Sequence, residues 1–117
     1  MDDIPSIINH ISLGTNDWEQ AVAFYDAVMP TIGAEKKLEF PGAAAYGKDF
    51  PEFWVQRPID QAPAQPGNGT HIAFIAPSRQ AVHDFYETAI AAGGRSDGEP
   101  GPRTEYGPGY YACFVID

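Results

Sequence analysis

The sequence predicts an α+β fold made of two successive copies of one strand-helix-strand unit. A shift of 61 residues aligns His10 with His71 and Gly33 with Gly94, within stretches of the same predicted secondary structure. Each copy starts with an alternating apolar stretch and continues with apolar residues at helical spacing. The segment 59–69, "IDQAPAQPGNG", is rich in Pro, Gly and Gln and separates the copies. Because the matching residues follow one another in the same order in both stretches, the sequence favours a duplicated supersecondary unit.

The first copy begins with a predicted strand over 7–14, "IINHISLG". The helix that follows is expected to start at Asn16 as N-cap, because Glu19 stands at the capping-box spacing. Pro30 and Gly33 are expected to close this helix. Its apolar stripe consists of Trp18, Ala21, Val22, Tyr25, Val28 and Met29. Three short strands are then expected over 36–40, 43–47 and 52–58, separated by turn residues.

The second copy is predicted to follow the same order. The stretch 70–76, "THIAFIA", is expected to form its first strand, and Ser78 lies near the start of its helix. Gly93 and Gly94 are expected to end this helix, because glycine readily adopts the left-handed backbone conformation found there. The Pro- and Gly-rich stretch 96–109 is interpreted as a loop before the strand 110–117. The order of elements is β-α-β-β-β in the first copy and β-α-β-β in the second, where one strand has no assigned bounds. This gives seven strands, and the second copy lacks a final one.

Length and composition indicate one folded domain. The 117 residues divide into a first module of about 5–58, the linker 59–69 and a second module of about 70–117. Hydrophobic residues are 44% and charged residues 20%, which is typical of a folded chain. No stretch has the length of a membrane span or the form of a signal peptide, so a cytoplasmic location is expected. The single Cys113 permits no internal disulfide and is interpreted as a small core residue.

The charge balance argues against two classes of partner. Seven basic residues are scattered among sixteen acidic ones, and the net charge is −9. A protein that binds phosphate backbones needs clustered Lys and Arg. We therefore expect no nucleic acid and no membrane surface as a partner.

The pattern resembles the vicinal oxygen chelate superfamily, which groups glyoxalases, bleomycin-resistance proteins and extradiol dioxygenases. The stretches "NHISLGTNDWEQAVAFYDAVM", "PEFWVQRP", "GNGTHIAF" and "YYACFVID" carry the resemblance over nearly the whole chain. It implies two βαβββ modules that form a cupped half-barrel around a divalent metal. It also implies that His10 and His71 occupy the two first-strand ligand positions. Zn, Fe, Ni or Mn would suit two imidazoles.

The sequence departs from that family pattern at two places. Trp54 stands where many relatives carry Glu, and Gln56 on the same side of the strand is a weak ligand. The strand expected to bear the second acidic ligand would come after Asp117. The ligand set is therefore incomplete, and the alternative stays open that His10 and His71 are hydrogen-bonded residues at strand ends.

Several residues are candidates for binding a small-molecule ligand. Two strands and the loop before the last strand contribute them: Tyr46, Trp54, Gln56, Arg103, Tyr106 and Tyr110. An Arg beside tyrosines is suited to a carboxylate or a ring. The alternative is that these aromatic residues pack the loop onto the sheet. His83, beside Asp84 on the second helix, is expected to be solvated.

Two functions follow from these observations. The first is a metal-dependent enzyme, either a lyase or isomerase of the glyoxalase type or a ring-cleaving dioxygenase. The alternative is a non-catalytic module that sequesters a planar or drug-like molecule. An aromatic content of 13% and the acidic surface favour a cationic aromatic ligand for that module. The open sheet edge also predicts a homodimer.

Overall fold

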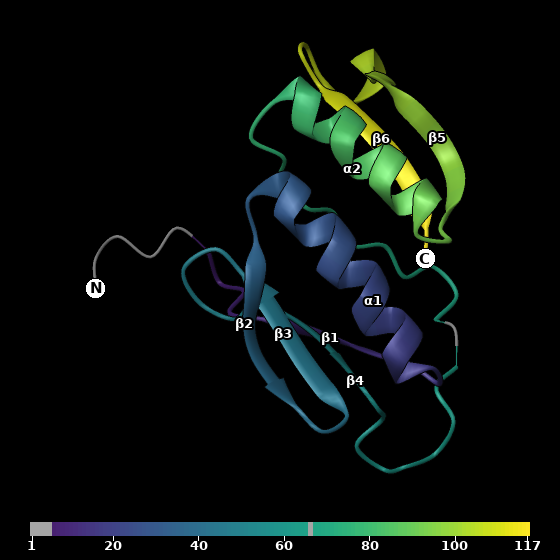
Figure 1. The fold of residues 1–117 in the computed structure, drawn as a ribbon. Helices are drawn as coiled ribbons and strands as arrows, with labels where there is room; N and C mark the ends of the chain where they lie inside the picture. The colour runs from purple at the N-terminus through teal and green to yellow at the C-terminus, as the bar shows by residue number, and fades with distance from the viewer. Residues whose placement is uncertain (1–5, 66) are drawn as a thin grey trace.

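The computed structural model describes residues 6–65 and 67–117. Figure 1 shows helix α1 beside a four-stranded sheet, helix α2 beside a two-stranded sheet, and the two helices next to each other. The elements of the first half are β1 (Ile11–Gly14), α1 (Trp18–Val28), β2 (Glu35–Phe40), β3 (Ala43–Gly47) and β4 (Phe53–Gln56). Those of the second half are α2 (Arg79–Ala91), β5 (Arg95–Pro102) and β6 (Tyr111–Ile116). The predicted α+β class is confirmed.

The first sheet has the strand order β1-β4-β3-β2. β1 runs parallel to β4, whereas β3 runs antiparallel to both β4 and β2. The three strands expected after the first helix are therefore confirmed. The second sheet consists of the antiparallel pair β5-β6.

Helix α1 begins one residue later than the sequence suggested. Asp17 is its N-cap, and the Asp17 carboxylate accepts a hydrogen bond from the backbone N–H of Gln20 at 3.1 Å. The expected cap Asn16 was wrong, because two neighbouring residues were equally good capping types. Asn16 instead exchanges two hydrogen bonds, of 2.9 and 2.6 Å, with the backbone of Ala64. It thereby holds the linker against the start of the helix.

The other helix boundaries agree with expectation. A short 3₁₀ turn follows α1 and ends at Gly33, whose φ of 82° is the left-handed conformation that glycine adopts readily. Ser78 caps α2 by accepting a hydrogen bond from the N–H of Ala81 at 3.1 Å. His83 is not simply solvated, because its Nε2 lies 2.6 Å from the hydroxyl of Tyr111 on β6.

The core lies between α1 and the first sheet and extends to α2. Its fully buried side chains include Val28 from α1, Val55 from β4 and Ala89 from α2. The segment 71–76 packs against this core through the ring of Phe74, which lies 5.1 Å from the ring of Phe53. Apolar contacts thus connect the two halves.

Two expectations for the second half were wrong. Residues 96–102 of the stretch expected to be a loop belong to β5, since an edge strand tolerates proline and the bulges beside Gly98 accommodate its φ of 152°. The rest of that stretch, 103–109, contains a short 3₁₀ turn and no strand, as expected. The stretch 71–76 has alternating burial but forms no strand in the structure. A strand needs a ladder partner, and β6 pairs with β5 alone in the part of the chain that is described. The described residues therefore form six strands rather than seven.

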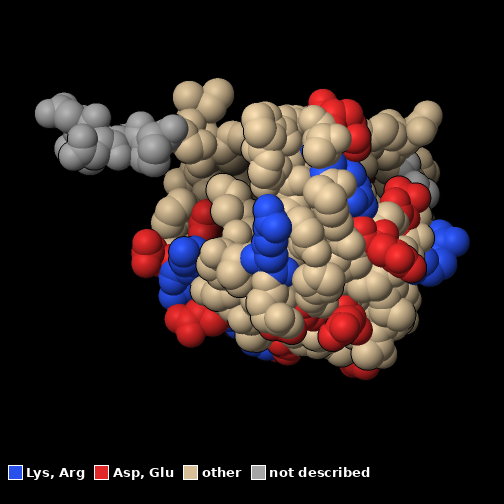
Figure 2. Space-filling model, turned by 90° about the horizontal axis from the view of Figure 1, so that it is seen from above, with Lys and Arg blue, Asp and Glu red and all other residues tan. Residues whose placement is uncertain are grey.

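The face seen in Figure 2 carries no cluster of basic side chains of the kind that binds an extended polyanion. Basic side chains do not gather into one patch there, and most of them have an acidic side chain nearby. Across residues 6–65 and 67–117, every helix is too short or too polar to cross a membrane.

Candidate functional site

One face of the first sheet brings together three of the predicted site residues. Trp54 and Gln56 are two residues apart on β4 and so point to the same side. The imidazole of His10 meets the indole of Trp54 edge-on, with 6.4 Å between ring centroids. Their neighbours on β3 are the small Ala45 and Ala43. We call His10, Trp54 and Gln56 the Trp54 face.

Tyr46 lies on the opposite side of this sheet. It is paired with Phe53, and its ring is 1% exposed. Its hydroxyl donates a hydrogen bond to the carboxylate of Asp26 on α1 at 2.8 Å. Burial, with this hydrogen bond second, raises the pKa of Tyr46. Tyr46 is therefore a core residue. It points away from the Trp54 side of the sheet, because its partner Phe53 is next to Trp54 on β4 and successive strand residues point to opposite faces.

A second cluster forms around Phe114 on β6. The ring of His71 lies 5.9 Å from that of Phe114, and the guanidinium of Arg103 lies 5.4 Å from the same ring. Arg103 also donates hydrogen bonds to the carbonyls of Glu99 at 2.7 Å and Pro102 at 3.3 Å. Arg103 thus shapes its own hairpin, and its cation lies over an aromatic face.

The remaining two predicted tyrosines lie in the loop before β6. The rings of Tyr106 and Tyr110 lie 5.4 Å apart at an interplanar angle of 58°, and the two residues are 62% and 45% exposed. The carbonyl of Tyr110 accepts a hydrogen bond from the N–H of Arg103 at 2.7 Å. The pair therefore packs the loop, as the alternative interpretation expected, and its rings still face solvent.

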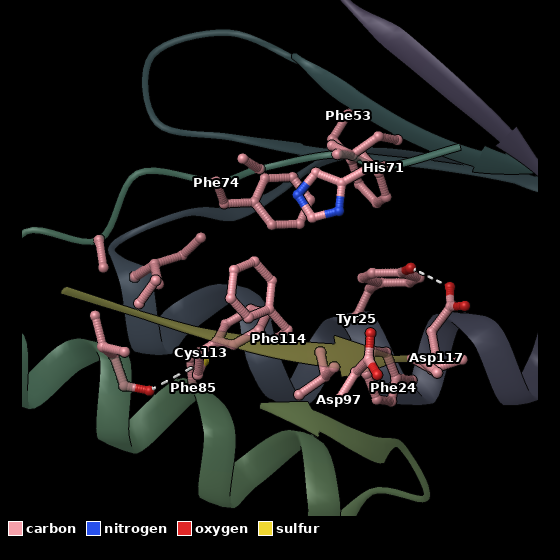
Figure 3. A pocket seen from close by; sticks show the side chains of 18 of the residues that line it. Phe24, Tyr25, Phe53, His71, Phe74, Phe85, Asp97, Cys113, Phe114 and Asp117 are labelled. Carbon is pink, nitrogen blue, oxygen red and sulfur yellow. Dashed lines mark hydrogen bonds between the residues drawn. The ribbon is translucent and has the colours of Figure 1, made fainter. Parts of the chain in front are cut away.

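A cavity of about 340 Å³ lies between 71–76 and β6 (Figure 3). Its wall is largely apolar and includes six aromatic rings: Phe24, Tyr25, Phe53, Phe74, Phe85 and Phe114. Asp97 and Asp117 are the carboxylates at its border. Tyr25 donates a hydrogen bond of 2.5 Å to Asp117, and burial followed by this bond raises the pKa of Tyr25. Sequence reasoning missed Tyr25 here, because its place in the apolar stripe of α1 gave no sign of a polar role.

The described residues do not make a metal site by themselves. His10 and His71 have different aromatic neighbours, Trp54 and Phe114. Within residues 6–65 and 67–117, no three His, Cys, Asp or Glu side chains are grouped so that they could hold a metal ion. Two imidazoles alone bind a divalent ion weakly.

The comparison with known proteins gives one family. Residues 7–115 match the model of the Glyoxalase/Bleomycin resistance protein/Dioxygenase superfamily. A glyoxalase/bleomycin resistance protein from Albidiferax ferrireducens T118 is 30% identical, with 96% of this chain and 90% of that chain covered and a TM-score of 0.84. None of the curated proteins matches.

More distant structures share the fold alone. A putative glyoxalase from Bacillus halodurans is 20% identical over 97% of this chain and 89% of that chain, with a TM-score of 0.70. The hypothetical protein SA1046 from S. aureus is 17% identical over 97% and 86% of the two chains, with a TM-score of 0.68.

Proposed function

The chain belongs to the glyoxalase/bleomycin resistance protein/dioxygenase superfamily, and on that premise we propose that it binds a small, planar, cationic organic molecule without catalysing a reaction. The observation that carries the proposal is the Trp54 face. An indole there stands beside an imidazole and an amide, and the described residues contain no cluster of three metal-ligating groups. An aromatic face of this kind holds a ring by stacking.

The charge of the ligand follows from two properties of the protein. Trp54 is half-buried, so part of its surface stays open to a ligand. A cation over tryptophan gains about 0.5–2 kcal/mol, depending on how far it is desolvated. The net charge of −9 also raises the local concentration of cations and lowers that of anions. Gln56 offers an amide that can donate to or accept from a polar edge of the ring.

The metal-dependent lyase, isomerase or dioxygenase is the second candidate. What favours it is that His10 and His71 hold corresponding positions in the two halves, each directly before a residue packed on the core. Against it stands the incomplete ligand set, since a catalytic site needs at least one more strong ligand. We therefore prefer the non-catalytic binding function to the metal-dependent enzyme.

The test uses proflavine, a cationic three-ring dye, and fluorescein as an anionic dye of similar ring size. We expect proflavine to bind the wild-type chain and fluorescein to bind much more weakly, as measured by dye anisotropy. Trp54→Ala should weaken proflavine binding roughly tenfold, whereas Trp54→Phe should retain most of it. The matched control is Trp18→Phe, which changes the other tryptophan. Equal binding by wild type and Trp54→Ala would refute the proposal.

A further inference from the structure

A cavity of about 380 Å³ lies between the two halves of the chain, at one end of the pair of helices. Helices α1 and α2 run in opposite directions, so the start of α1 and the end of α2 lie at the same end of the pair (Figure 1). The cavity is bordered by the first two turns of α1, by Ala64 and Gln65 of the linker and by Ala92 and Gly93 after α2. The described residues that line it include no member of the Trp54 face. We call it the interhelix cavity.

Hydrogen bonds hold the walls of this cavity in place. Asn16 exchanges bonds of 2.9 and 2.6 Å with the backbone of Ala64, so the linker is fixed beside the start of α1. The hydroxyl of Thr15 accepts a hydrogen bond from the N–H of Asp17 at 3.1 Å. The Asp17 carboxylate in turn accepts one from the N–H of Gln20 at 3.1 Å. The border of the cavity is therefore built from segments whose backbone is already bonded.

The buried part of the lining is apolar. It is drawn from β1, α1 and β4, and its members are Leu13, Ala21, Phe24, Tyr25 and Val55. Phe24, Tyr25 and Val55 belong to the hydrophobic core, so a molecule that enters the cavity meets apolar surface at its inner end. Pockets of roughly 300–1,000 Å³ are the size that small organic ligands occupy. The interhelix cavity therefore suits a small organic molecule rather than a bare ion.

The charged groups at the border are negative. Among the described residues of the lining, Asp17 and Asp117 carry the charges, and Lys, Arg and His are absent. Asp117 accepts the hydrogen bond from Tyr25, whereas Asp17 uses Oδ1 for Gln20 and leaves Oδ2 for a ligand. A full carboxylate outweighs the partial positive charge, roughly half an elementary charge, at the start of α1. The end of α2 contributes partial negative charge. The border therefore favours a cation.

The polar side chains at the border indicate what kind of cation fits. Gln20 and Gln65 are exposed and offer amide oxygens at the same border as the Asp17 carboxylate. A primary ammonium group carries three N–H donors and no acceptor. One carboxylate and two amide oxygens match that number of donors, whereas a quaternary ammonium has no N–H to donate. A primary amine with an alkyl chain therefore matches both the polar border and the apolar inner surface.

We propose that the interhelix cavity binds a small aliphatic primary amine as its ammonium ion. The ammonium group lies on the Asp17 carboxylate, and the alkyl chain lies on the apolar lining beside Ala21 and Val55. The site is separate from the Trp54 face and takes a ligand of different shape. Because the first half, the linker and the second half all border the cavity, the bound amine contacts both halves of the chain.

The test is an NMR titration of the ¹⁵N-labelled chain with n-butylammonium. We expect the largest shifts of backbone amide signals at residues 13–21, 64–65 and 92–93. The neutral 1-butanol, which has the same chain length, should bind roughly tenfold more weakly, because it forms no charge-assisted hydrogen bond. The anionic butyrate should cause no shifts at these residues. Equal binding of 1-butanol and butylammonium, or butylammonium shifts centred elsewhere, would overturn the proposal.

A matched pair of substitutions separates the site from the overall charge of −9. Asp17→Asn removes the carboxylate but keeps a helix cap, because Asn and Asp are equally good N-cap residues. It should weaken butylammonium binding roughly tenfold. Glu19→Gln removes the same charge two residues away, outside the lining, and should change binding by less than about twofold. Equal weakening by both variants would show that the amine responds only to the general field and would refute the site.

The same titrations keep this proposal apart from the proposed function. Trp54→Ala should leave butylammonium binding unchanged, and Asp17→Asn should leave proflavine binding unchanged. A loss of butylammonium binding in Trp54→Ala would mean that the amine binds on the Trp54 face and would contradict the interhelix site. Failure of proflavine to bind, by contrast, would count against the Trp54 face alone.

Discussion

The rings of Phe53 and Phe74 meet edge-to-face, with 5.1 Å between their centroids and an interplanar angle of 89°. Phe53 belongs to β4, and Phe74 belongs to the unpaired segment 71–76. This geometry is the favoured one for aromatic pairs. Because 71–76 has no strand ladder in the described structure, side-chain packing of this kind holds it on the core.

We expect Phe53→Ala to lower the free energy of unfolding by about 3–5 kcal/mol, because it leaves a cavity among aromatic rings. Combined with Phe74→Ala, the loss should fall short of the sum by roughly 0.5–1.5 kcal/mol, which is the energy of the pair. Urea unfolding of the two single variants and the double variant measures these changes in the free energy of unfolding. The control Ile59→Ala, in the exposed linker, should change little. Strict additivity of Phe53→Ala and Phe74→Ala would show that the contact has no energetic weight.

Stability should depend on pH in the alkaline range. Burial, and then hydrogen bonds to carboxylates, raise the pKa of both Tyr25 and Tyr46 above the ordinary value of 10.0. The folded chain therefore holds these two protons more tightly than the unfolded chain does. Their contribution is complete below about pH 10 and is lost progressively as the pH rises above it.

Equilibrium unfolding between neutral and strongly alkaline pH checks this. The double variant Tyr25→Phe/Tyr46→Phe should lose less stability over the alkaline range than wild type, and Tyr106→Phe, an exposed control, should behave as wild type. An identical alkaline profile for the double variant and wild type would disprove the linkage.

Helix capping gives a matched pair of substitutions. Asp17→Ala and Ser78→Ala each remove a side-chain acceptor from a helix N-terminus and should each cost about 0.5–2 kcal/mol. Glu19→Ala, at the position that pointed to Asn16 as the cap, should cost less. Thermal unfolding measures all three. A larger loss for Glu19→Ala than for Asp17→Ala would mean that the helix start is misassigned.

The metal question has its own experiment. Calorimetric titration of Zn, Fe(II), Ni and Mn should show weak or absent binding by the chain, because His10 and His71 supply two ligands. Appending a Glu-bearing strand after Asp117 should strengthen binding, since a carboxylate adds charge and a third ligand. His10→Ala or His71→Ala should then remove the gain, while His83→Ala should not. Tight binding by the unextended chain would contradict the incomplete site.

The sequence predicted much of the fold because periodicity and caps are local signals. Both helices, the strands β2, β3 and β4, and the stops at Gly33 and Gly93 were foreseen from spacing and residue type. The pairing of strands is not local. The segment 71–76 has the pattern of a strand, yet no partner lies beside it in the described chain. The module boundaries near 58 and 70 stay a prediction, which limited proteolysis of the linker would test.

The candidate site was predicted in part. Trp54 and Gln56 share a face as expected, because a period of two follows from β4 alone. Tyr46 was misplaced, since the face of a residue on β3 depends on its register against β4. The contacts of Arg103 with Glu99 and Phe114 depend on a hairpin that composition had suggested to be a loop. Long-range register is what the sequence of one strand cannot encode by itself.

The central claim is that this chain binds a planar cation on the Trp54 face without a metal. It is tested most directly by titrating proflavine into the wild-type chain twice, once with EDTA and once with excess Zn²⁺. The account predicts the same Kd within about twofold, and a loss of roughly tenfold for Trp54→Ala in both conditions. Binding that appears only with the metal, or that is unchanged in Trp54→Ala, would contradict it.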